Sequence, residues 1–394
     1  MKRYTYIMGM AIFLSLLMTT PTIAEETEQK SETELTEDAK ASILLERDTG
    51  EILYEKNPHE KLPPASMTKT MTMLLIMEAI EHKKLSLDET VTISERASSM
   101  GGSQVFLEEG EQMSVEDLIK SIAIASANDA SVALAERIAG TEEAFVQMMN
   151  EKAEQLGLEN TKFQNSSGLP AEEHYSTAYD MAIIAKELLK YEDIVHYTSI
   201  YEDYLRKGEE NEFWLVNTNK LVRFYPYVDG LKTGYTSEAK FCLTATAKKD
   251  DMRVVTVVMG ADTAKSRNAM TMNLVDYAFN HYESEKIFDQ GEKVATLRHI
   301  QSKGLTYDVK TSEQISLLHK KGETASDSFT TEINLDEDIE LPIERGEEVG
   351  TLLIKQDNDT IVQSSLVVEE DVKTASFYDL LKRSLKNIAK YKTS

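Results

Sequence analysis

The proline pair Pro63-Pro64 and the apolar run Ser66–Ile80 that follows it constrain the fold more than any other part of the chain. A proline pair cannot lie inside a helix, but it can lead into one. The run contains no Gly or Pro and is rich in Met, Leu and Ile, which is typical of a buried helix. Ser66 and Lys69 fall one turn apart on the same face. We therefore expect a buried helix whose first turn presents a hydroxyl beside an amine.

This pairing of Ser66 and Lys69 is suited to nucleophilic catalysis. A hydroxyl is a weak nucleophile until a neighbouring base takes its proton, and a lysine is such a base when burial and nearby cations lower its pKa. The spacing alone is not selective, because Ser237 and Lys240 have it as well. Further motifs are therefore needed to identify which of the two serines is the nucleophile.

The length and the first residues indicate an exported protein with more than one domain. The chain has 394 residues, whereas a typical domain has about 150. Residues 1–24 combine a basic start, an apolar centre and small residues before Ala24, as a secretory signal peptide does, and we expect cleavage after Ala24. An uncleaved anchor is the alternative. Residues 25–39 are acidic and polar, and are predicted to form a disordered lead.

The composition excludes several classes of function. Lys and Arg number 43 against 68 Asp and Glu, and this acidic balance argues against nucleic acid as a partner. Cys242 is the single cysteine, so no internal disulfide can form. The seven histidines show no ligand spacing, and we expect neither a metal nor another cofactor.

Strand and helix patterns predict an α+β domain over residues 40–286. A hairpin pattern at 41–54 and strand patterns at 241–247 and 253–259 enclose a helical region, and a further helix is predicted at 264–282. Such an order favours an antiparallel sheet with strands from both ends and an inserted helical cluster.

The remaining sequence predicts two further parts. Residues 287–370 contain short alternating strand patterns and are expected to form a small β-sandwich-like domain. Residues 371–394 contain an amphipathic helix over 376–391, with Phe377, Leu381 and Leu385 on one face and lysines opposite. This basic helix in an acidic protein is expected to anchor the chain at a membrane surface, and docking on its own domain is the alternative.

Two more short motifs follow Ser66 and Lys69 in a fixed order. Ser126-Ala127-Asn128 lies at a predicted break between helices, and Lys232-Thr233-Gly234 starts a predicted strand. A second Ser-x-Asn pattern, Ser266 to Asn268, comes after Lys232 and therefore in the wrong order. The joint order selects Ser66 rather than Ser237 as the nucleophile.

Each residue of these motifs has a physical task in acyl transfer. Ser126 can relay a proton to a leaving amine, and the Asn128 amide can donate to a substrate carbonyl and accept from a lysine. Lys232 attracts a substrate carboxylate and helps to keep Lys69 neutral. Gly234 is expected to leave room for the substrate backbone, and the amides of Ser66 and Tyr235 to stabilise an oxyanion.

The motifs and their surroundings resemble a known family. The blocks Ala65–Lys69, Met100–Gln104, Ile124–Ala130 and Val228–Thr236 are similar to those of low-molecular-mass penicillin-binding proteins that are serine-type D-alanyl-D-alanine carboxypeptidases, the peptidase S11 family and its DacF-like group. The resemblance covers nearly the whole chain and implies a β-lactamase/transpeptidase-like domain. Ala127 departs from the pattern, since many relatives have Gly there.

The resemblance also implies roles and partners. Ser66 would attack the bond between the last two D-alanines of a peptidoglycan stem peptide, with Lys69 as base and Ser126 as proton relay. Lys232, together with Thr233 or Thr236, would hold the terminal carboxylate, and Arg267 is a candidate second contact. β-Lactams would acylate Ser66. The enzyme would then act at the outer face of the cell membrane.

Two other functions share part of this pattern. A class A β-lactamase would carry Glu-x-x-Leu-Asn between Asn128 and Lys232, and the sequence has none there. A β-lactam-sensing or cell-wall-binding module that is acylated without turnover stays open, because no motif reports the access of water.

Overall fold

The structure is a computed structural model that describes residues 34–322, 329–336, 339–356 and 359–391, with side chains up to residue 385. The predicted signal peptide and residues 25–33 of the predicted disordered lead lie outside the described residues. Residues 35–39 form an ordered turn, in which Thr36 is buried and its Oγ1 lies 2.7 Å from Ser42 Oγ. The prediction of disorder is therefore wrong for residues 35–39, because this turn packs against the first strand.

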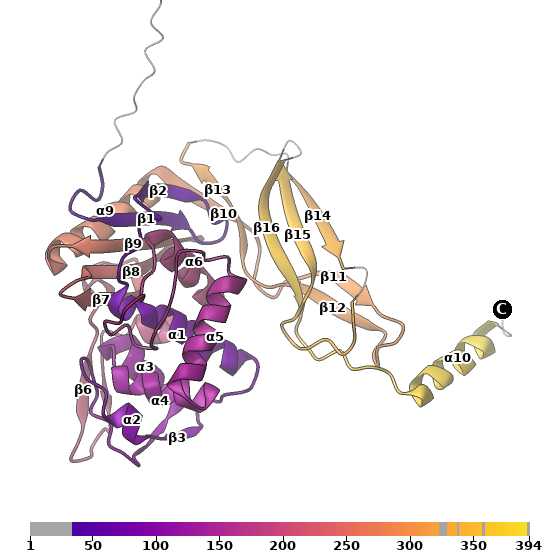
Figure 1. The fold of residues 1–394 in the computed structure, drawn as a ribbon. Coiled ribbons are helices and arrows are strands. Elements are labelled where there is room, and N and C mark those ends of the chain that lie inside the picture. Colours follow the sequence, from indigo (N-terminus) through magenta and orange to yellow (C-terminus); the bar gives the residue numbers. More distant parts are fainter. Residues whose placement is uncertain (1–33, 323–328, 337–338, 357–358, 392–394) are drawn as a thin grey trace, which may run out of the picture. The chain divides into compact units, whose positions relative to one another are not determined.

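A five-stranded antiparallel sheet forms the centre of the larger part, in the order β2-β1-β9-β8-β7 (Figure 1). The strands are β1 (Ala41–Glu46), β2 (Ile52–Lys56), β7 (Val228–Thr236), β8 (Lys240–Lys249) and β9 (Met252–Ala261). Strand β9 lies in the middle, and all of its residues are buried. Strands from both ends of this part thus share one sheet, and the predicted α+β class is confirmed. Strand β7 is left at an edge.

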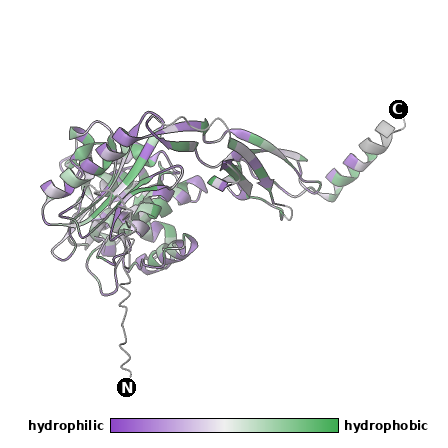
Figure 2. Ribbon diagram, turned by 90° about the horizontal axis from the view of Figure 1, so that it is seen from above, coloured by the Kyte–Doolittle hydropathy of each residue, from purple (hydrophilic) through white to green (hydrophobic). Residues whose placement is uncertain are grey.

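Helices cover both faces of the sheet. Helix α9 (Ala264–His281) packs its Leu274 against Leu44 and Val258 on one face. Ile43 and Val257, which point the other way, belong to the core that contains α1 (Lys69–Glu81) and α6 (Ala178–Leu188). The alternation of neighbouring strand residues between two cores is the period of two that a sheet imposes. Figure 2 shows the hydrophobic segments gathered in the interior of this part.

Three helices of the cluster on the α1 side, α3 (Val115–Ala125), α5 (Glu142–Gln155) and α6, begin with a side-chain cap. Ser114, Thr141 and Thr177 each accept a hydrogen bond from the third backbone N–H of the helix that follows. The remaining elements of this part are η1 (Ala65–Thr68), β3 (Thr90–Thr92), α2 (Glu95–Ser98), β4 (Gln112–Ser114), α4 (Asn128–Ala139), α7 (Ile194–Thr198), β5 (Glu202–Leu205), β6 (Phe213–Val216) and α8 (Leu221–Phe224).

Beyond α9 the chain forms strands around a separate core. A five-stranded sheet has the order β11-β12-β16-β15-β14, and β10 pairs with β13. Its core includes Val309, Leu352, Ile354 and Leu366. The strands are β10 (Tyr282–Phe288), β11 (Lys293–Arg298), β12 (Thr306–Thr311), β13 (Ile315–Lys320), β14 (Phe329–Leu335), β15 (Glu348–Gln356) and β16 (Asp359–Val368). Helix α10 (Phe377–Tyr391) follows.

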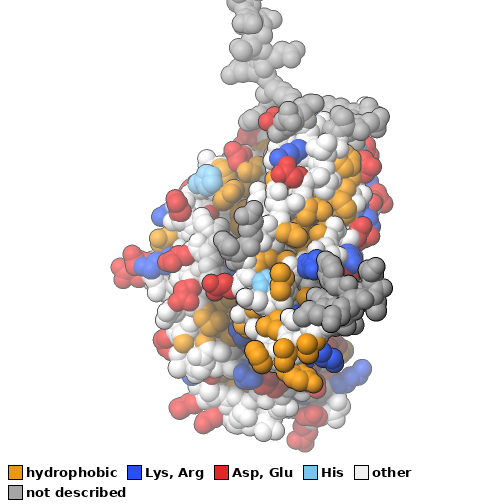
Figure 3. Space-filling model, turned by 90° about the vertical axis from the view of Figure 1, so that its right-hand side faces the viewer, with side chains coloured by type: hydrophobic (Ala, Val, Ile, Leu, Met, Phe, Trp, Pro, Cys, Tyr) orange, Lys and Arg blue, Asp and Glu red, His pale blue; other side chains and the backbone are white. Residues whose placement is uncertain are grey.

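The surface agrees with the acidic composition. On the face that Figure 3 shows, carboxylates are spread among the lysines and arginines. Acidic and basic side chains are therefore mixed on this face.

Candidate active site

Ser66 lies in a short 3-10 turn that leads into a buried helix. The turn η1 comprises Ala65–Thr68, and α1 begins at Lys69, so the serine precedes the α-helix rather than occupying its first turn as we expected. Two glycines allow this turn to pack closely. A Cβ on Gly168 would lie 1.9 Å from Ala65 O, and one on Gly234 would lie 2.7 Å from Pro64 O. The Ser66 turn is therefore held between a loop and the edge strand β7.

Lys69 is fully buried and makes three contacts through Nζ. It donates to Asn128 Oδ1 and to Ser167 O, both at 2.6 Å, and lies 3.2 Å from Ser66 Oγ. Both carbonyl oxygens can only accept, so each takes one N–H of the amine. In the neutral amine the third position is a lone pair, which then faces the Ser66 hydroxyl. This geometry suits proton transfer from Ser66 to Lys69.

The surroundings of Lys69 favour the neutral amine. Burial lowers the pKa of Lys69 well below its usual value, and the positive charge of Lys232 lowers it further. Asp129 acts in the opposite direction. Its carboxylate accepts hydrogen bonds from the amides of Val105 and Leu107, which fix the loop beside the site.

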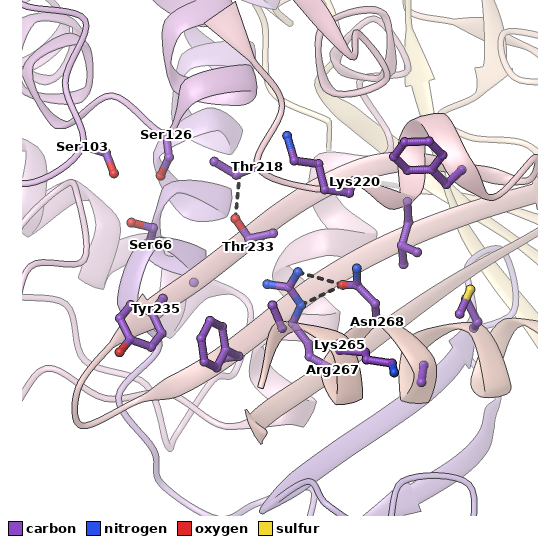
Figure 4. A pocket seen from close by; sticks show the side chains of 17 residues that line it. Ser66, Ser103, Ser126, Thr218, Lys220, Thr233, Tyr235, Lys265, Arg267 and Asn268 are labelled. Carbon is purple, nitrogen blue, oxygen red and sulfur yellow. Dashed lines mark hydrogen bonds between the residues drawn. The ribbon is translucent and has the colours of Figure 1, made fainter. Parts of the chain in front are cut away.

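Ser126 and Asn128 come from the break between α3 and α4. Ser126 ends α3 in a left-handed conformation with φ of 64°, and this terminates the helix. The side-chain Nδ2 of Asn128 donates to Gly101 O, and its backbone N–H donates to Ser103 O, each at 2.7 Å. Figure 4 shows Ser66, Ser103 and Ser126 pointing toward one another. Three hydroxyls thus share the space beside Lys69.

Lys232 and Arg267 form a cationic end of the same cavity region. Lys232 is buried, and burial together with Arg267 lowers its pKa to about 7. Arg267 is held by Asn268 Oδ1 at 2.7 Å and by Cys242 O at 3.4 Å, and burial lowers its pKa to about 10. In the described contacts neither cation has a carboxylate partner. Because an unpaired buried cation is costly, this end is suited to an anionic ligand.

One cavity of about 770 Å³ joins these groups. Ser66, Ser126, Thr233 and Arg267 all line it (Figure 4). Thr233 donates to Thr218 Oγ1 at 2.7 Å, which directs its side chain to the cavity wall. The sequence motifs are therefore assembled in and beside a single cavity: Arg267 lines it, and Lys232 is buried next to Thr233, where its charge acts on Lys69.

Three residues of β7 differ in their surroundings. A side chain at Gly234 would meet Pro64, Ala65 and Met67, so this glycine lets the Ser66 turn pack on the strand, and it also lines the cavity. Thr236 is not among the residues that line this cavity, and its Oγ1 accepts from Ala239 N at 3.0 Å. Of the two threonines, Thr233 is the one that shares the cavity wall with Arg267. Tyr235 lines the cavity and is about half exposed.

The second Ser-x-x-Lys motif and the second Ser-x-Asn motif lie at a turn and at a helix cap. Ser237 and Lys240 are exposed at the turn between β7 and β8, so neither is near a buried base. Ser266 belongs to the cap of α9, where its amide bonds to Thr263 Oγ1 at 3.0 Å. Both of these repeated motifs, Ser237 with Lys240 and Ser266 with Asn268, therefore have positions that explain them without a role in catalysis.

Several groups of the site were not predicted. Ser167 contributes through its backbone carbonyl, and no side-chain pattern reports such a contact. Ser103 lies in the block Met100–Gln104 that carries part of the resemblance, and this was the one available signal. Thr218 follows β6 without any motif. No group of three His, Cys, Asp or Glu in the described residues could hold a metal ion.

Comparison with protein families agrees with this geometry. The D-alanyl-D-alanine carboxypeptidase model of peptidase S11 matches residues 26–263, and the C-terminal domain model of penicillin-binding protein 5 matches residues 282–374. The chain belongs to the peptidase S11 family of D-alanyl-D-alanine carboxypeptidases. It is a serine DD-carboxypeptidase of this family, and the penicillin-binding protein resemblance of the sequence is confirmed.

Individual relatives are similar to this chain over most of their own length. The D-alanyl-D-alanine carboxypeptidase DacF of Bacillus subtilis is 51% identical over 97% of this chain and 98% of its own. Penicillin-binding protein 5 of Haemophilus influenzae is 31% identical, with a TM-score of 0.65 over 85% of this chain and 98% of its own. Penicillin-binding protein D2 of Listeria monocytogenes, in an ampicillin-bound form, is 32% identical, with a TM-score of 0.56 over 61% and 98%.

The contact between Gly168 and the Ser66 turn leads to a testable prediction. Gly168 and Gly208 have the same φ of +84°, but only Gly168 has backbone where a Cβ would lie. Gly208→Ala should cost about 1–2 kcal/mol of stability through backbone strain. Gly168→Ala should cost about 1–3 kcal/mol more and slow acylation of Ser66, because Ala65 must move. Denaturant unfolding and the rate of penicillin labelling measure both. Equal effects of the two substitutions would contradict the proposed support of the turn.

Proposed function

We propose that this enzyme removes the terminal D-alanine from peptidoglycan stem pentapeptides through an acyl-enzyme on Ser66, and that β-lactams acylate the same serine. The contact of Lys69 with Ser66, Asn128 and Ser167 carries this proposal. It supplies a neutral amine whose free lone pair faces the nucleophile. The unpaired cations Lys232 and Arg267 supply the site for the terminal carboxylate.

The first half of the reaction forms the acyl-enzyme. Ser66 Oγ attacks the carbonyl carbon of the penultimate D-alanine while Lys69 Nζ accepts its proton. The amides of Ser66 and Tyr235 are the candidate donors to the oxyanion. When the C–N bond breaks, the proton held by Lys69 passes through Ser126 to the leaving nitrogen, D-alanine departs, and Lys69 is neutral again.

In the second half, neutral Lys69 takes a proton from the water molecule that attacks the ester carbonyl. It passes this proton to Ser66 Oγ as the ester bond breaks, so both residues return to their starting forms and the shortened peptide leaves. This return distinguishes a carboxypeptidase from a module that is acylated but does not turn over.

Replacing the two candidate serines tests the assignment of the nucleophile. Ser66→Ala should abolish both labelling by a fluorescent penicillin and D-alanine release from diacetyl-L-lysyl-D-Ala-D-Ala. Ser237→Ala should leave both nearly unchanged, because Ser237 is exposed in a turn away from Lys69. Labelling that survives Ser66→Ala would place the nucleophile elsewhere. Labelling of the unaltered protein without D-alanine release would support the sensing module instead.

The two lysines predict a bell-shaped pH profile of kcat/KM. Lys69 must be neutral to accept a proton, so the rate rises as the pH passes its lowered pKa. Lys232 must be charged to attract the carboxylate, so the rate falls as the pH rises through its pKa of about 7. A peptide that ends in D-alanyl-D-alaninamide has no carboxylate and should lose the falling limb. An identical falling limb for the amide would contradict this role of Lys232.

We further propose export of the chain after cleavage at Ala24 and attachment of α10 to the outer face of the cell membrane. The described part of α10 exposes Phe377, Tyr378, Leu381 and Leu385. Lys382 provides a cation that favours anionic lipid, whereas Arg383 donates to Ile300 O and Ser302 O and so links the helix to the preceding domain. None of the described helices is long and apolar enough to cross a membrane. The division into domains at residues 40–286, 287–370 and 371–394 is part of this proposal.

Deletion of residues 376–394 from the signal-cleaved protein should release it from anionic vesicles without loss of D-alanine release. Leu381→Ser with Leu385→Ser retains the cations and should weaken vesicle binding about tenfold, because apolar surface no longer enters the interface. Cosedimentation measures both effects. Continued sedimentation of the truncated protein would favour the alternative, a helix that packs on its own domain.

A further inference from the structure

A second cavity lies next to the Ser66 turn, on the side away from Arg267. Its volume is about 600 Å³, and its walls are residues 61–65, the loop 168–175, and Thr236 with Glu238. It shares no residue with the first cavity. The two cavities are lined by consecutive residues at two points: Ala65 and Thr236 line the second cavity, and Ser66 and Tyr235 line the first. Ser66 therefore lies between two cavities that follow one another along β7.

The direction of a bound peptide follows from the position of the cations. The terminal carboxylate belongs at Thr233, beside Lys232 and Arg267, so the rest of the peptide extends toward Thr236. Strand β7 is at the edge of its sheet, and an extended peptide can pair with such an edge. From Thr233 to Thr236 a strand advances about 10 Å, the length of about three extended residues. The third residue from the carboxyl end thus reaches the second cavity.

The walls of the second cavity are preformed. Gln164 N donates to His174 Nδ1 at 3.2 Å, so Nε2 carries the proton and donates to Thr68 Oγ1 at 2.8 Å. Burial lowers the pKa of His174 to about 4, which keeps this ring neutral. Thr72 Oγ1 also donates to Ser166 O at 2.6 Å. The loop is thereby attached to the same helix segment that carries Ser66 and Lys69.

The charges that line the second cavity are mainly negative. Glu172 and Glu238 are exposed, and neither has a hydrogen bond or an ion pair in the described contacts. Glu173 pairs with Lys162 at 2.7 Å. Lys61, the single lysine of the described lining, lies 4.7 Å from the centre of the Tyr175 ring. The two carboxylates are therefore available to a cationic ligand group.

We propose that this cavity binds the side chain of the residue before the penultimate D-alanine, and that Glu172 and Glu238 select a side chain ending in a primary ammonium group. The inference rests on the proposed carboxypeptidase function and adds its substrate preference. A long side chain can place its methylenes against Pro63, Pro64 and Leu169 while its ammonium reaches the carboxylates.

Three peptides that differ only in this side chain test the inference on the signal-cleaved chain. They are Nα-acetyl-L-lysyl-, Nα,Nε-diacetyl-L-lysyl- and Nα-acetyl-L-norleucyl-D-Ala-D-Ala, and the measured quantity is kcat/KM for D-alanine release. The free ammonium should give about a three- to tenfold higher value than either neutral side chain, because two exposed ion pairs each contribute modestly. Added salt should reduce the ratio.

Substitutions assign the preference to the two carboxylates. Glu172→Gln with Glu238→Gln should bring the ratio of lysyl to norleucyl peptide close to one, and Glu238→Lys should bring it below one. Glu143→Gln, at an exposed glutamate of α5 outside both cavities, is the matched control and should leave the ratio unchanged.

The outcomes separate this inference from the function on which it rests. Equal kcat/KM for all three peptides, with D-alanine released, would overturn the substrate preference and leave the carboxypeptidase function standing. A preference that persists in the double Gln variant would also overturn the assigned residues. Absence of D-alanine release from every peptide would overturn the proposed function and this inference with it.

Discussion

The buried amine of Lys69 is the group on which the rest of the site depends. Its two acceptors, Asn128 Oδ1 and Ser167 O, come from different segments, and Ser167 is 98 residues away in the sequence. An ammonium ion in this place would carry a large desolvation cost, whereas a neutral amine needs only two acceptors and leaves its lone pair free. The helical cluster can thus be understood as the framework that brings the α3–α4 break and the loop at 165–168 to one nitrogen atom.

The unpaired cations couple substrate binding to this base. In the free enzyme, Lys232 disfavours a proton on Lys69 and so keeps the base ready. A bound carboxylate neutralises part of the positive potential of Lys232 and Arg267. The amine of Lys69 then becomes more basic at the moment when Ser66 must lose its proton.

The sequence could predict those parts of the site that depend on side-chain chemistry at the ends of elements. Ser66, Lys69, Ser126 and Asn128 lie at or next to helix ends, as chain order and helix boundaries predicted, whereas Lys232 lies within β7 rather than at its start. Ser167 could not be predicted, because a carbonyl oxygen is common to every residue type. The long helices and central strands were predicted from their periodicity, whereas the short elements β3, β4, α7 and α8 owe their form to tertiary packing. The sequence could not distinguish Thr233 from Thr236, because three residues along β7 are enough to pass from one cavity to the next.

Strand β7 itself explains why one edge can serve both cavities. Its pairing with β8 fixes the spacing of its residues, and Gly234 lets Pro64 approach so that the Ser66 turn rests against the strand. A side chain at position 234 would push the nucleophile away from the strand with which substrate is proposed to pair. The distance from the carboxylate site to the Ser66 hydroxyl is thus set by backbone packing rather than by flexible side chains. A rigid spacing of this kind favours peptides with one residue beyond the cleaved bond, which is the specificity of a carboxypeptidase.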